Sequence, residues 1–271
     1  MHPEIEDAVR RALAEDIGTG DITTNLCVPA EAHATGSMIA RESLTLAGVE
    51  LLPLIFTGCR VELSGRSGDR LQDGDEIAVV RGQARALLTG ERAALNFVQR
   101  LSGIATAASA YVRAVEGTGC RILDTRKTTP GLRRLEKMAA AAGGATNYRL
   151  GLFDAVLIKN NHITAAGGVR AALERTRDAG VPVEIEVRTR PELDEALACG
   201  ATHLLLDNLH PDEARDWIAH IDGRAKVELS GGITLENARA YAETGADFLS
   251  SGAITHSARA VDINLRLELL P

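Results

Sequence analysis

The 271-residue sequence has few aromatic side chains and no long apolar run. Phe, Trp and Tyr together make up 3% of it, which leaves little material for the stacking platforms that bind single-stranded nucleic acid. No stretch approaches the ~20 consecutive apolar residues that cross a membrane. Residues 1–4 also lack the basic-then-apolar order of a secretory signal. The sequence therefore indicates a cytoplasmic protein that acts on neither nucleic acid nor a membrane.

Cysteine is scarce as well. The sequence contains four, and no two of them form a C-x-x-C pair or lie near a cluster of histidines: Cys27, Cys59, Cys120 and Cys199. This spacing argues against a structural zinc site. Isolated buried thiols are the simpler interpretation.

Charge of both signs is plentiful but unevenly distributed. The net charge is −7, yet residues 92–159 contain 11 Lys or Arg and 4 Asp or Glu, a local charge of +7, so the remainder carries −14. A positive region in an acidic chain favours an anionic substrate at that region. A solvated basic helix face is the alternative on charge alone.

The first 103 residues predict a mixed α/β unit. Residues 4–15 have helical periodicity, and two glycines within residues 15–23 break it. Four strands separated by Gly/Asp turns are expected at residues 34–41, 44–48, 59–63 and 76–81. Residues 86–115 predict two helices that meet near Ser102 and Gly103.

From residue 121 the pattern changes to short apolar runs with amphipathic helices between them. The predicted strands are 121–125, 155–158, 183–187, 203–206, 227–229 and 248–250, with a weak seventh near 144–148. The predicted helices are 131–142, 165–179, 190–198, 211–221 and 235–244. This alternation predicts a parallel sheet, either a βα barrel short of eight strands or an open doubly wound sheet.

Polar, charged or glycine residues follow each of these predicted strands. They are Arg126, Lys127 and Thr128; Lys159 to His162; Glu186 and Arg188; Asp207 and Asn208; Ser230, Gly231 and Gly232; and Ser251 and Gly252. The carboxyl ends of parallel strands meet at one edge, so these side chains should converge. Any one of them could be a surface residue, a turn or a helix cap, but six consecutive strand ends point together to a site.

The composition of the convergent set favours a substrate with several carboxylates or phosphates. Its cations, Arg126, Lys127, Arg149 and Lys159, can make charge-assisted hydrogen bonds to such groups. Glu186 and Asp207 suit ribose hydroxyls or a Mg²⁺ ion carried by a pyrophosphate. The turns at 230–232 and 251–253 suit a phosphate held by backbone N–H groups.

Two histidines follow strands in this set. His162 is a candidate acid or base, with a hydrogen-bonded packing histidine as the equal alternative. His256 follows the last glycine turn and could orient a phosphate or cap a helix.

These motifs carry a resemblance that runs over nearly the whole chain. The densest match is Asp124-Thr125-Arg126-Lys127-Thr128-Thr129-Pro130-Gly131-Leu132-Arg133, preceded by Gly90 to Asn96 and followed by Ser230 to Ile233 and Gly252 to Ser257. On these residues the sequence resembles the type II phosphoribosyltransferases, and among them the quinolinate phosphoribosyltransferase family.

The resemblance implies an α/β fold with an N-terminal α/β sandwich at 1–103, to which 259–271 return, and an incomplete parallel βα barrel at 104–258. It implies phosphoribosyl transfer from phosphoribosyl pyrophosphate to quinolinate with decarboxylation, giving nicotinate mononucleotide, pyrophosphate and CO₂ in NAD biosynthesis. It also implies Mg²⁺ as cofactor and a homodimer that lends Arg92 across its interface, with a higher oligomer left open.

The resemblance assigns roles to individual residues. Arg126, Arg149 and Lys159 are expected to bind the quinolinate carboxylates, with Thr125 and Tyr148 beside them. Lys127 is expected to bind the pyrophosphate. Glu186 and Asp207 take the ribose and the Mg²⁺, directly, through water or through substrate. The 5′-phosphate cradle is Ser230, Gly231, Gly232, Ser251, Gly252 and Ala253. Lys127, Glu186 and Asp207 are the predicted catalytic residues.

Two positions depart from the family pattern. Tyr148 stands where members usually carry His. A side chain that can carry a positive charge is thus replaced by a hydroxyl group that donates a hydrogen bond but stays neutral. Asn160 stands where many have Asp, which removes a negative charge beside Lys159. The alternatives are a sister phosphoribosyltransferase of the kind associated with molybdate transport, a Schiff-base lyase using Lys127 or Lys159, and a non-catalytic binding protein that kept the fold.

Overall fold

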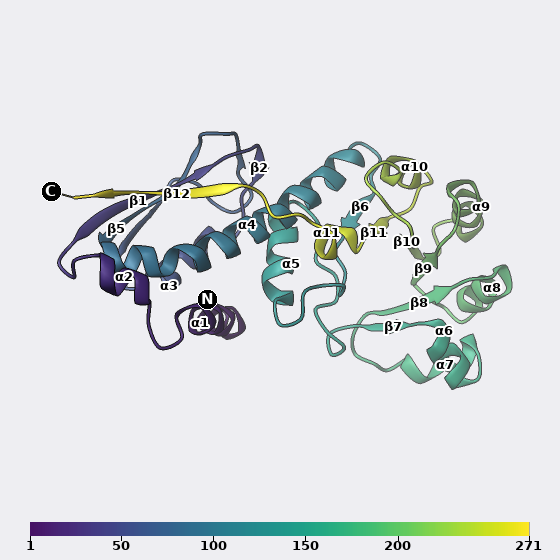
Figure 1. Cartoon of the computed structure of the whole chain (residues 1–271). Coiled ribbons are helices and arrows are strands. Elements are labelled where there is room, and N and C mark those ends of the chain that lie inside the picture. Colours follow the sequence, from purple (N-terminus) through teal and green to yellow (C-terminus); the bar gives the residue numbers. More distant parts are fainter. Residues whose placement is uncertain (271) are drawn as a thin grey trace. The chain divides into compact units, whose positions relative to one another are not determined.

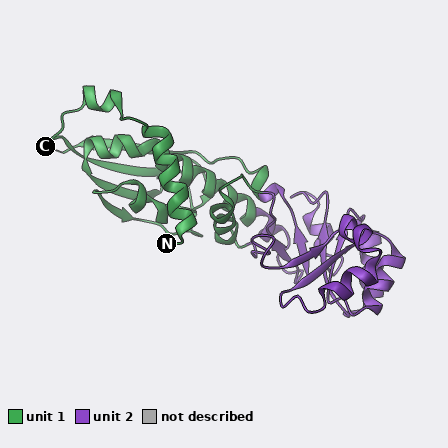
Figure 2. Ribbon diagram, turned by 90° about the horizontal axis from the view of Figure 1, so that it is seen from below, with its two compact units in different colours: residues 1–109, 128–144, 255–271 green, residues 110–127, 145–254 purple. Residues whose placement is uncertain are grey.

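The computed structural model describes residues 1–270, which divide into two compact units (Figure 2). Of these residues, unit 1 comprises 1–109, 128–144 and 255–270, and unit 2 comprises 110–127 and 145–254. No helix within residues 1–270 is both long and apolar enough to cross a membrane.

A four-stranded antiparallel sheet forms the centre of unit 1. Its order is β12 (Ile263–Leu269), β1 (His33–Ala40), β5 (Glu76–Gln83) and β3 (Arg60–Leu63). Burial alternates along β1, so one face of the strand is covered. The pair β2 (Leu44–Thr45) and β4 (Arg70–Leu71) forms a separate small sheet.

Helices cover the buried face of this sheet (Figure 1). The first part of α4 (Ala84–Ala114) and α3 (Leu52–Ile55) lie along it. The unit also contains α1 (Pro3–Ile17), which packs on α3 and α5 (Arg133–Ala142), and the short helices α2 (Ile22–Cys27) and η1 (Val49–Leu51). A Cβ at Gly36 of β1 would lie 3.1 Å from the side chain of Leu87, so α4 packs closely on that strand. Helix α2 was not predicted; Asp21 caps it by accepting the Thr24 N–H at 2.9 Å.

The prediction of two helices within residues 86–115 is wrong, because α4 runs unbroken for 31 residues. Ser102 and Gly103 do not end the helix but allow close contacts along it. The Ser102 hydroxyl accepts the Ala47 N–H at 2.9 Å. A Cβ at Gly103 would lie 2.0 Å from the carbonyl oxygen of Arg259, so only glycine fits there.

Unit 2 is built on a six-stranded parallel sheet, and all six strong strand predictions are confirmed. The strands are β6 (Arg121–Leu123), β7 (Val156–Ile158), β8 (Val183–Val187), β9 (His203–Asp207), β10 (Lys226–Ser230) and β11 (Phe248–Ser250), in the order β6-β11-β10-β9-β8-β7. The weak seventh strand is reduced to one parallel bridge between Leu123 and Thr146. The fold is therefore α/β, with an α/β sandwich and an incomplete parallel barrel, as predicted.

The helices of unit 2 follow the strands, with two corrections. They are α6 (Asn160–Ala166), α7 (Val169–Thr176), α8 (Arg190–Ala198), α9 (Pro211–Ile221), α10 (Ala238–Ala242) and α11 (Ala253–His256), the last of which ends in unit 1. The helix predicted at 165–179 is two helices, because Gly167 and Gly168 adopt positive φ angles of 92° and 130°. The helix predicted at 235–244 is shorter, because Asn237 uses its side chain to hold the preceding turn.

Candidate active site

One face of the parallel sheet is polar at the carboxyl ends of its strands. Paired residues of parallel strands point to the same face, and side chains alternate along each strand. Glu186 of β8 pairs with Leu205 of β9. Asp207 lies two residues after Leu205 and so points to the same face, and it pairs with Ser230 of β10. The pairing of β7 with β8 extends this face to position 159. Lys159, Glu186, Asp207 and Ser230 therefore gather at one edge of one face, as the sequence predicted.

Glu186 is buried and held by a neighbouring cation. Its side chain is 6% exposed, and Nε and Nη2 of Arg188 both lie 3.0 Å from its Oε1. Arg188 is fixed in turn through its backbone, because its N–H donates to Glu192 Oε2 at 2.8 Å. The carboxylate at the end of β8 is thus oriented before any substrate arrives.

The ends of β9 and β10 fit tightly together. Asn208 has a positive φ of 60°, and its N–H donates to the Ser230 carbonyl oxygen at 2.8 Å. A Cβ at Gly231 would lie 2.2 Å from Asn208 Oδ1, and Gly231 itself has a φ of 90°. Glycine is required at 231 because Asn208 fills the adjacent space, whereas a Cβ at Gly232 would meet no atom within 4 Å, so the turn is open to a ligand at Gly232.

Two carboxylates hold the segment that carries Tyr148 and Arg149. Asp124, which is buried, accepts the Tyr148 N–H at 3.0 Å. Asp154 accepts the N–H groups of Leu150 and Gly151 at 2.6 and 3.0 Å. Between these anchors Arg149 has a φ of 37°, a conformation that costs energy for a residue other than glycine. Such strain is retained where the surrounding contacts fix a functional side chain.

An acidic pair lies buried on the polar face. Glu184 and Glu228 are 3% and 5% exposed and hydrogen-bonded to each other. Burial raises the pKa of both carboxyls, and their mutual repulsion raises that of Glu228 further. The Tyr148 hydroxyl bonds to Glu184, and burial together with this negative neighbour raises its pKa. Tyr148 is therefore a neutral group whose hydroxyl is already oriented.

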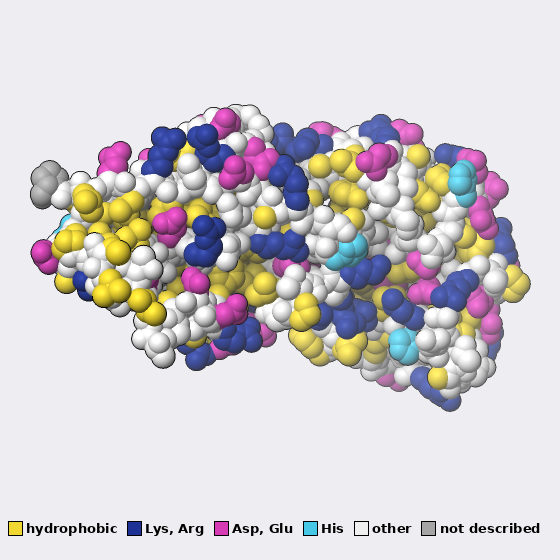
Figure 3. Space-filling view, in the orientation of Figure 1, with side chains coloured by type: hydrophobic (Ala, Val, Ile, Leu, Met, Phe, Trp, Pro, Cys, Tyr) yellow, Lys and Arg dark blue, Asp and Glu magenta, His cyan; other side chains and the backbone are white. Residues whose placement is uncertain are grey.

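The lysines at the ends of β6 and β7 are exposed, whereas Arg126 is half-buried. Lys127 follows β6, and its N–H donates to Thr125 Oγ1 at 3.1 Å. Lys159 precedes α6, and its N–H donates to His162 Nδ1 at 2.9 Å. This bond gives the His162 ring a capping role at α6, although the side chain is exposed and not packed in the interior. On the face drawn in Figure 3, Lys and Arg side chains gather over the region of β7 and β8.

Sequence comparisons place both units in one family. The family described as "Quinolinate phosphoribosyl transferase, N-terminal domain" matches residues 21–102, and that described as "Quinolinate phosphoribosyl transferase, C-terminal domain" matches residues 104–266. The chain belongs to the quinolinate phosphoribosyltransferase family. The resemblance seen in the sequence is confirmed.

Relatives of this family cover the chain almost completely. A nicotinate-nucleotide pyrophosphorylase [carboxylating] of Mycobacterium leprae is 46% identical over 96% of each chain. A probable nicotinate-nucleotide pyrophosphorylase [carboxylating] of Bacillus subtilis is 40% identical over 99% of this chain and 95% of its own. The crystal structure of NadC from Streptococcus pyogenes is 36% identical and superposes with a TM-score of 0.94, over 100% of this chain and 99% of its own.

In this member of the family, unit 2 carries the predicted site residues with one exception. Arg92 lies in unit 1, exposed on the surface of α4. Ser251 is buried, and its Oγ donates to the carbonyl oxygen of Ile233 at 2.9 Å, which ties the second glycine turn to the chain after the first. His256 is exposed at the end of α11, where its Nδ1 lies 2.6 Å from Ser257 Oγ.

The carboxylates of the site are too few to hold a metal ion alone. Within residues 1–270 no group of three or more His, Cys, Asp or Glu side chains is arranged to ligate one. Glu186 and Asp207 supply two hard oxygen donors on one face, which fits Mg²⁺ only when a substrate and water complete its six ligands.

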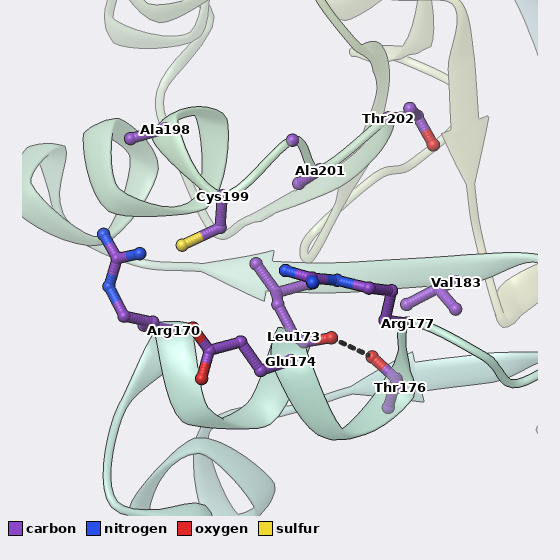
Figure 4. A pocket seen from close by; sticks show the side chains of 11 residues that line it. Arg170, Leu173, Glu174, Thr176, Arg177, Val183, Ala198, Cys199, Ala201 and Thr202 are labelled. Carbon is purple, nitrogen blue, oxygen red and sulfur yellow. Dashed lines mark hydrogen bonds between the residues drawn. The ribbon is translucent and has the colours of Figure 1, made fainter.

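A cavity of unit 2 lies away from this edge (Figure 4). It has a volume of about 310 Å³ and includes Val183, the first residue of β8, so it opens at the amino ends of the strands. Arg170 and Glu174 of α7 face Cys199 across it, and Thr176 bonds within its own helix to the Leu173 carbonyl oxygen at 3.1 Å. The cavity is separate from the polar edge that carries Glu186.

Several residues that the structure places around the site were absent from the predicted set, among them Asp124, Glu184 and Glu228. Arg188 was noted as a strand-end residue but given no role, although its contact with Glu186 follows from a spacing of two along one strand edge. Glu136 of α5 was missed altogether; it holds the backbone of Thr129, in the loop that follows Lys127. Its only signal was an acidic residue on the mainly apolar face of a predicted helix.

Proposed function

We propose that this chain transfers the phosphoribosyl group of phosphoribosyl pyrophosphate to quinolinate, with loss of CO₂, to give nicotinate mononucleotide and pyrophosphate in NAD biosynthesis. The observation that carries this function is the placement of Lys159, Glu186, Asp207 and Ser230 at one edge of one face of the sheet. The names of the Mycobacterium leprae and Bacillus subtilis relatives describe this reaction in its reverse, carboxylating sense.

The cations bind the two carboxylates of quinolinate. Arg126, Arg149 and Lys159 provide guanidinium and ammonium donors that match a dicarboxylate. Thr125 and Tyr148 are next to Arg126 and Arg149 in sequence and contribute hydroxyl groups, that of Tyr148 exchanging its bond to Glu184 for one to the substrate. This set orients the pyridine nitrogen toward C1 of the ribose, so that positioning contributes much of the rate.

The carboxylates act on the ribose, and the turns hold its phosphate. As the C1–O bond to pyrophosphate breaks, positive charge develops on the ribose, and Glu186 and Asp207 stabilise it electrostatically. Lys127 neutralises the departing pyrophosphate. The 5′-phosphate is held by backbone N–H groups of the two glycine turns, which are formed by Ser230, Gly231, Gly232, Ser251, Gly252 and Ala253.

Decarboxylation needs no organic cofactor. Once its nitrogen carries the ribose, the positive charge on that nitrogen stabilises the electron pair that stays on C2 when CO₂ departs, and a proton then adds to this pair. Mg²⁺ is the one cofactor of the proposal: held through Glu186, Asp207, water and substrate oxygens, it would neutralise charge on the pyrophosphate.

The active unit is a homodimer in which each protomer lends Arg92 to its partner's site, and its place is the cytoplasm. The exposed position of Arg92 supports this arrangement, as do two exposed apolar side chains close to Arg149 in sequence, Leu152 and Phe153 (78% and 76% exposed). Mixing inactive Arg92→Ala with inactive Lys159→Ala protein should rebuild one intact site per mixed dimer. Activity should return to roughly a quarter of wild type, whereas no recovery after mixing would contradict the shared site.

The activity is tested by incubating the protein with quinolinate, phosphoribosyl pyrophosphate and Mg²⁺, with nicotinate as the parallel substrate. Mass spectrometry should detect nicotinate mononucleotide and CO₂ from quinolinate alone. Lys159→Ala should lose about 2–4 kcal/mol of transition-state stabilisation, the scale of removing one partner from a charged contact.

Lys226→Ala is the matched control, since Lys226 is an exposed lysine that pairs with Asp247 at the amino end of β10. It should leave kcat/KM unchanged. Absence of product from quinolinate would overturn the proposed function, and ligand binding without turnover would identify a binding protein instead.

A further inference from the structure

The contact between Arg188 and Glu186 is unusual in its geometry. Nε and Nη2 of the guanidinium both lie 3.0 Å from the same oxygen, Oε1, rather than one on each oxygen. Both donors of Arg188 thus bind Oε1, and Oε2 can accept a hydrogen bond from a further donor. Glu186 is 6% exposed while Arg188 is 48% exposed, so the cation covers the carboxylate from the solvent side.

The position of Arg188 is built into the start of α8. Thr189 accepts the Glu192 N–H at 3.3 Å, and Glu192 Oε2 accepts the Arg188 N–H at 2.8 Å, a reciprocal cap that fixes the chain between them. Because the backbone of Arg188 is held, its side chain reaches Glu186 without ordering a mobile loop.

A second carboxylate lies on the same polar face. Glu186 and Asp207 end neighbouring strands, and Asp207 Oδ2 accepts the side-chain N–H of Asn208 at 2.6 Å. Two carboxylates at one strand edge repel each other and attract a divalent cation. The guanidinium of Arg188 already supplies positive charge at Glu186. It therefore weakens the binding of a metal ion to Glu186 in the absence of substrate.

We propose that Arg188 is a positioning residue that serves as the fixed counter-ion of Glu186. It replaces a resident metal ion, holds Oε2 ready for a ribose hydroxyl, and so limits magnesium to the ion that phosphoribosyl pyrophosphate brings with it. This role rests on the proposed function of the site, but its first test does not depend on turnover.

That test measures Mn²⁺ binding by electron paramagnetic resonance in the absence of substrate, on the intact protein. Arg188→Gln should bind Mn²⁺ at least about tenfold more tightly than wild type, because the counter-ion is gone. The double variant Arg188→Gln/Glu186→Gln should lose this binding, which locates the ion at Glu186. Equal Mn²⁺ affinity in wild type and Arg188→Gln would overturn the proposal.

The control variant is Arg215→Gln, which changes the net charge equally. Arg215 is an exposed arginine of α9 that pairs with Asp212 at 3.0 Å. The Arg215→Gln variant should have the Mn²⁺ affinity and the catalytic activity of the wild type. A gain of Mn²⁺ binding in this variant would show that net charge, and not the contact with Glu186, controls the metal.

Kinetics provide the second readout. Arg188→Gln should raise KM for phosphoribosyl pyrophosphate about tenfold with a smaller change in kcat, since a less ordered Glu186 binds ribose less well. Arg188→Lys should restore most of the loss. Unchanged KM in Arg188→Gln would overturn the positioning role. A wild-type protein that forms no product would refute the proposed function, while the Mn²⁺ titration would still decide the role of Arg188.

Discussion

Replacing Glu136 by alanine should destabilise unit 1 more than any other single carboxylate change we propose. The Glu136 side chain is fully buried in α5 and accepts Arg100 Nη2 at 3.0 Å. It also accepts the N–H and hydroxyl of Thr129 at 3.1 and 2.7 Å, and so anchors the loop that follows Lys127. The substitution removes all of these acceptors and leaves the Arg100 charge without its counter-ion.

The loss of stability depends on the hydrogen bonds that Arg100 retains in the variant. Removing one partner of a buried ion pair costs about 3–5 kcal/mol. Arg100 still donates to the carbonyl oxygens of Thr255 and Ala258 at 2.8 and 2.6 Å, so the lower end applies. A loss of about 3 kcal/mol at about 2–4 °C per kcal/mol lowers Tm by roughly 6–12 °C.

Differential scanning calorimetry measures this change, with Glu4→Ala as the control. Glu4 makes an exposed pair with Arg134 at 2.7 Å in the same unit, and such pairs contribute about 0–1 kcal/mol. Glu136→Gln keeps one acceptor and should fall between the two. A Glu136→Ala protein that melts within about 2 °C of wild type would refute the argument that this carboxylate anchors the loop.

Three further predictions concern single side chains. Gly231→Ala should raise KM for phosphoribosyl pyrophosphate and cost about 1–3 kcal/mol of stability, because its Cβ would collide with Asn208 at a positive φ; a wild-type Tm and KM would contradict this. Arg259 lowers the pKa of Glu42 from 4.5 to about 2, so the stability it contributes is complete above pH 4.5 and lost as pH falls toward 2. Glu42→Gln should therefore flatten Tm against pH in that window, and parallel curves would count against the pair. Tyr148→His should lower KM for quinolinate near pH 6, where the imidazole can be charged, and a higher KM there would show that the tyrosine hydroxyl is the better partner.

Periodicity was sufficient to predict the parallel sheet. The strands of unit 2 are short apolar runs between amphipathic helices. The face that the helices cover requires apolar residues, and Ile185, Val187, Leu204 and Leu206 are all completely buried. The same periodicity failed at α4. The local preference of Gly103 to end a helix is overridden there by its close contact with the Arg259 carbonyl, which lies more than 150 residues away in sequence.

The predicted strand-end residues share a face because alternation along parallel strands is a local rule. The contacts that hold them are not local. Asp124 reaches Tyr148 across 24 residues, and Glu136 reaches Arg100 across 36. Neither partner could be chosen from composition, since the sequence offers many other carboxylates and arginines. Arg188 could have been assigned, because a cation two residues after a strand-end carboxylate can reach back to it.

The antiparallel sheet of unit 1 can be completed only late in synthesis. β1 is flanked by β5 and by β12, and β12 is made more than 200 residues after β1. Between residues 40 and 263 a ribosome that adds about 5–20 residues per second needs roughly 10–45 seconds, during which one edge of β1 has no partner. An unpaired strand edge can associate with another chain. The nascent protein should therefore depend on chaperones until β12 emerges.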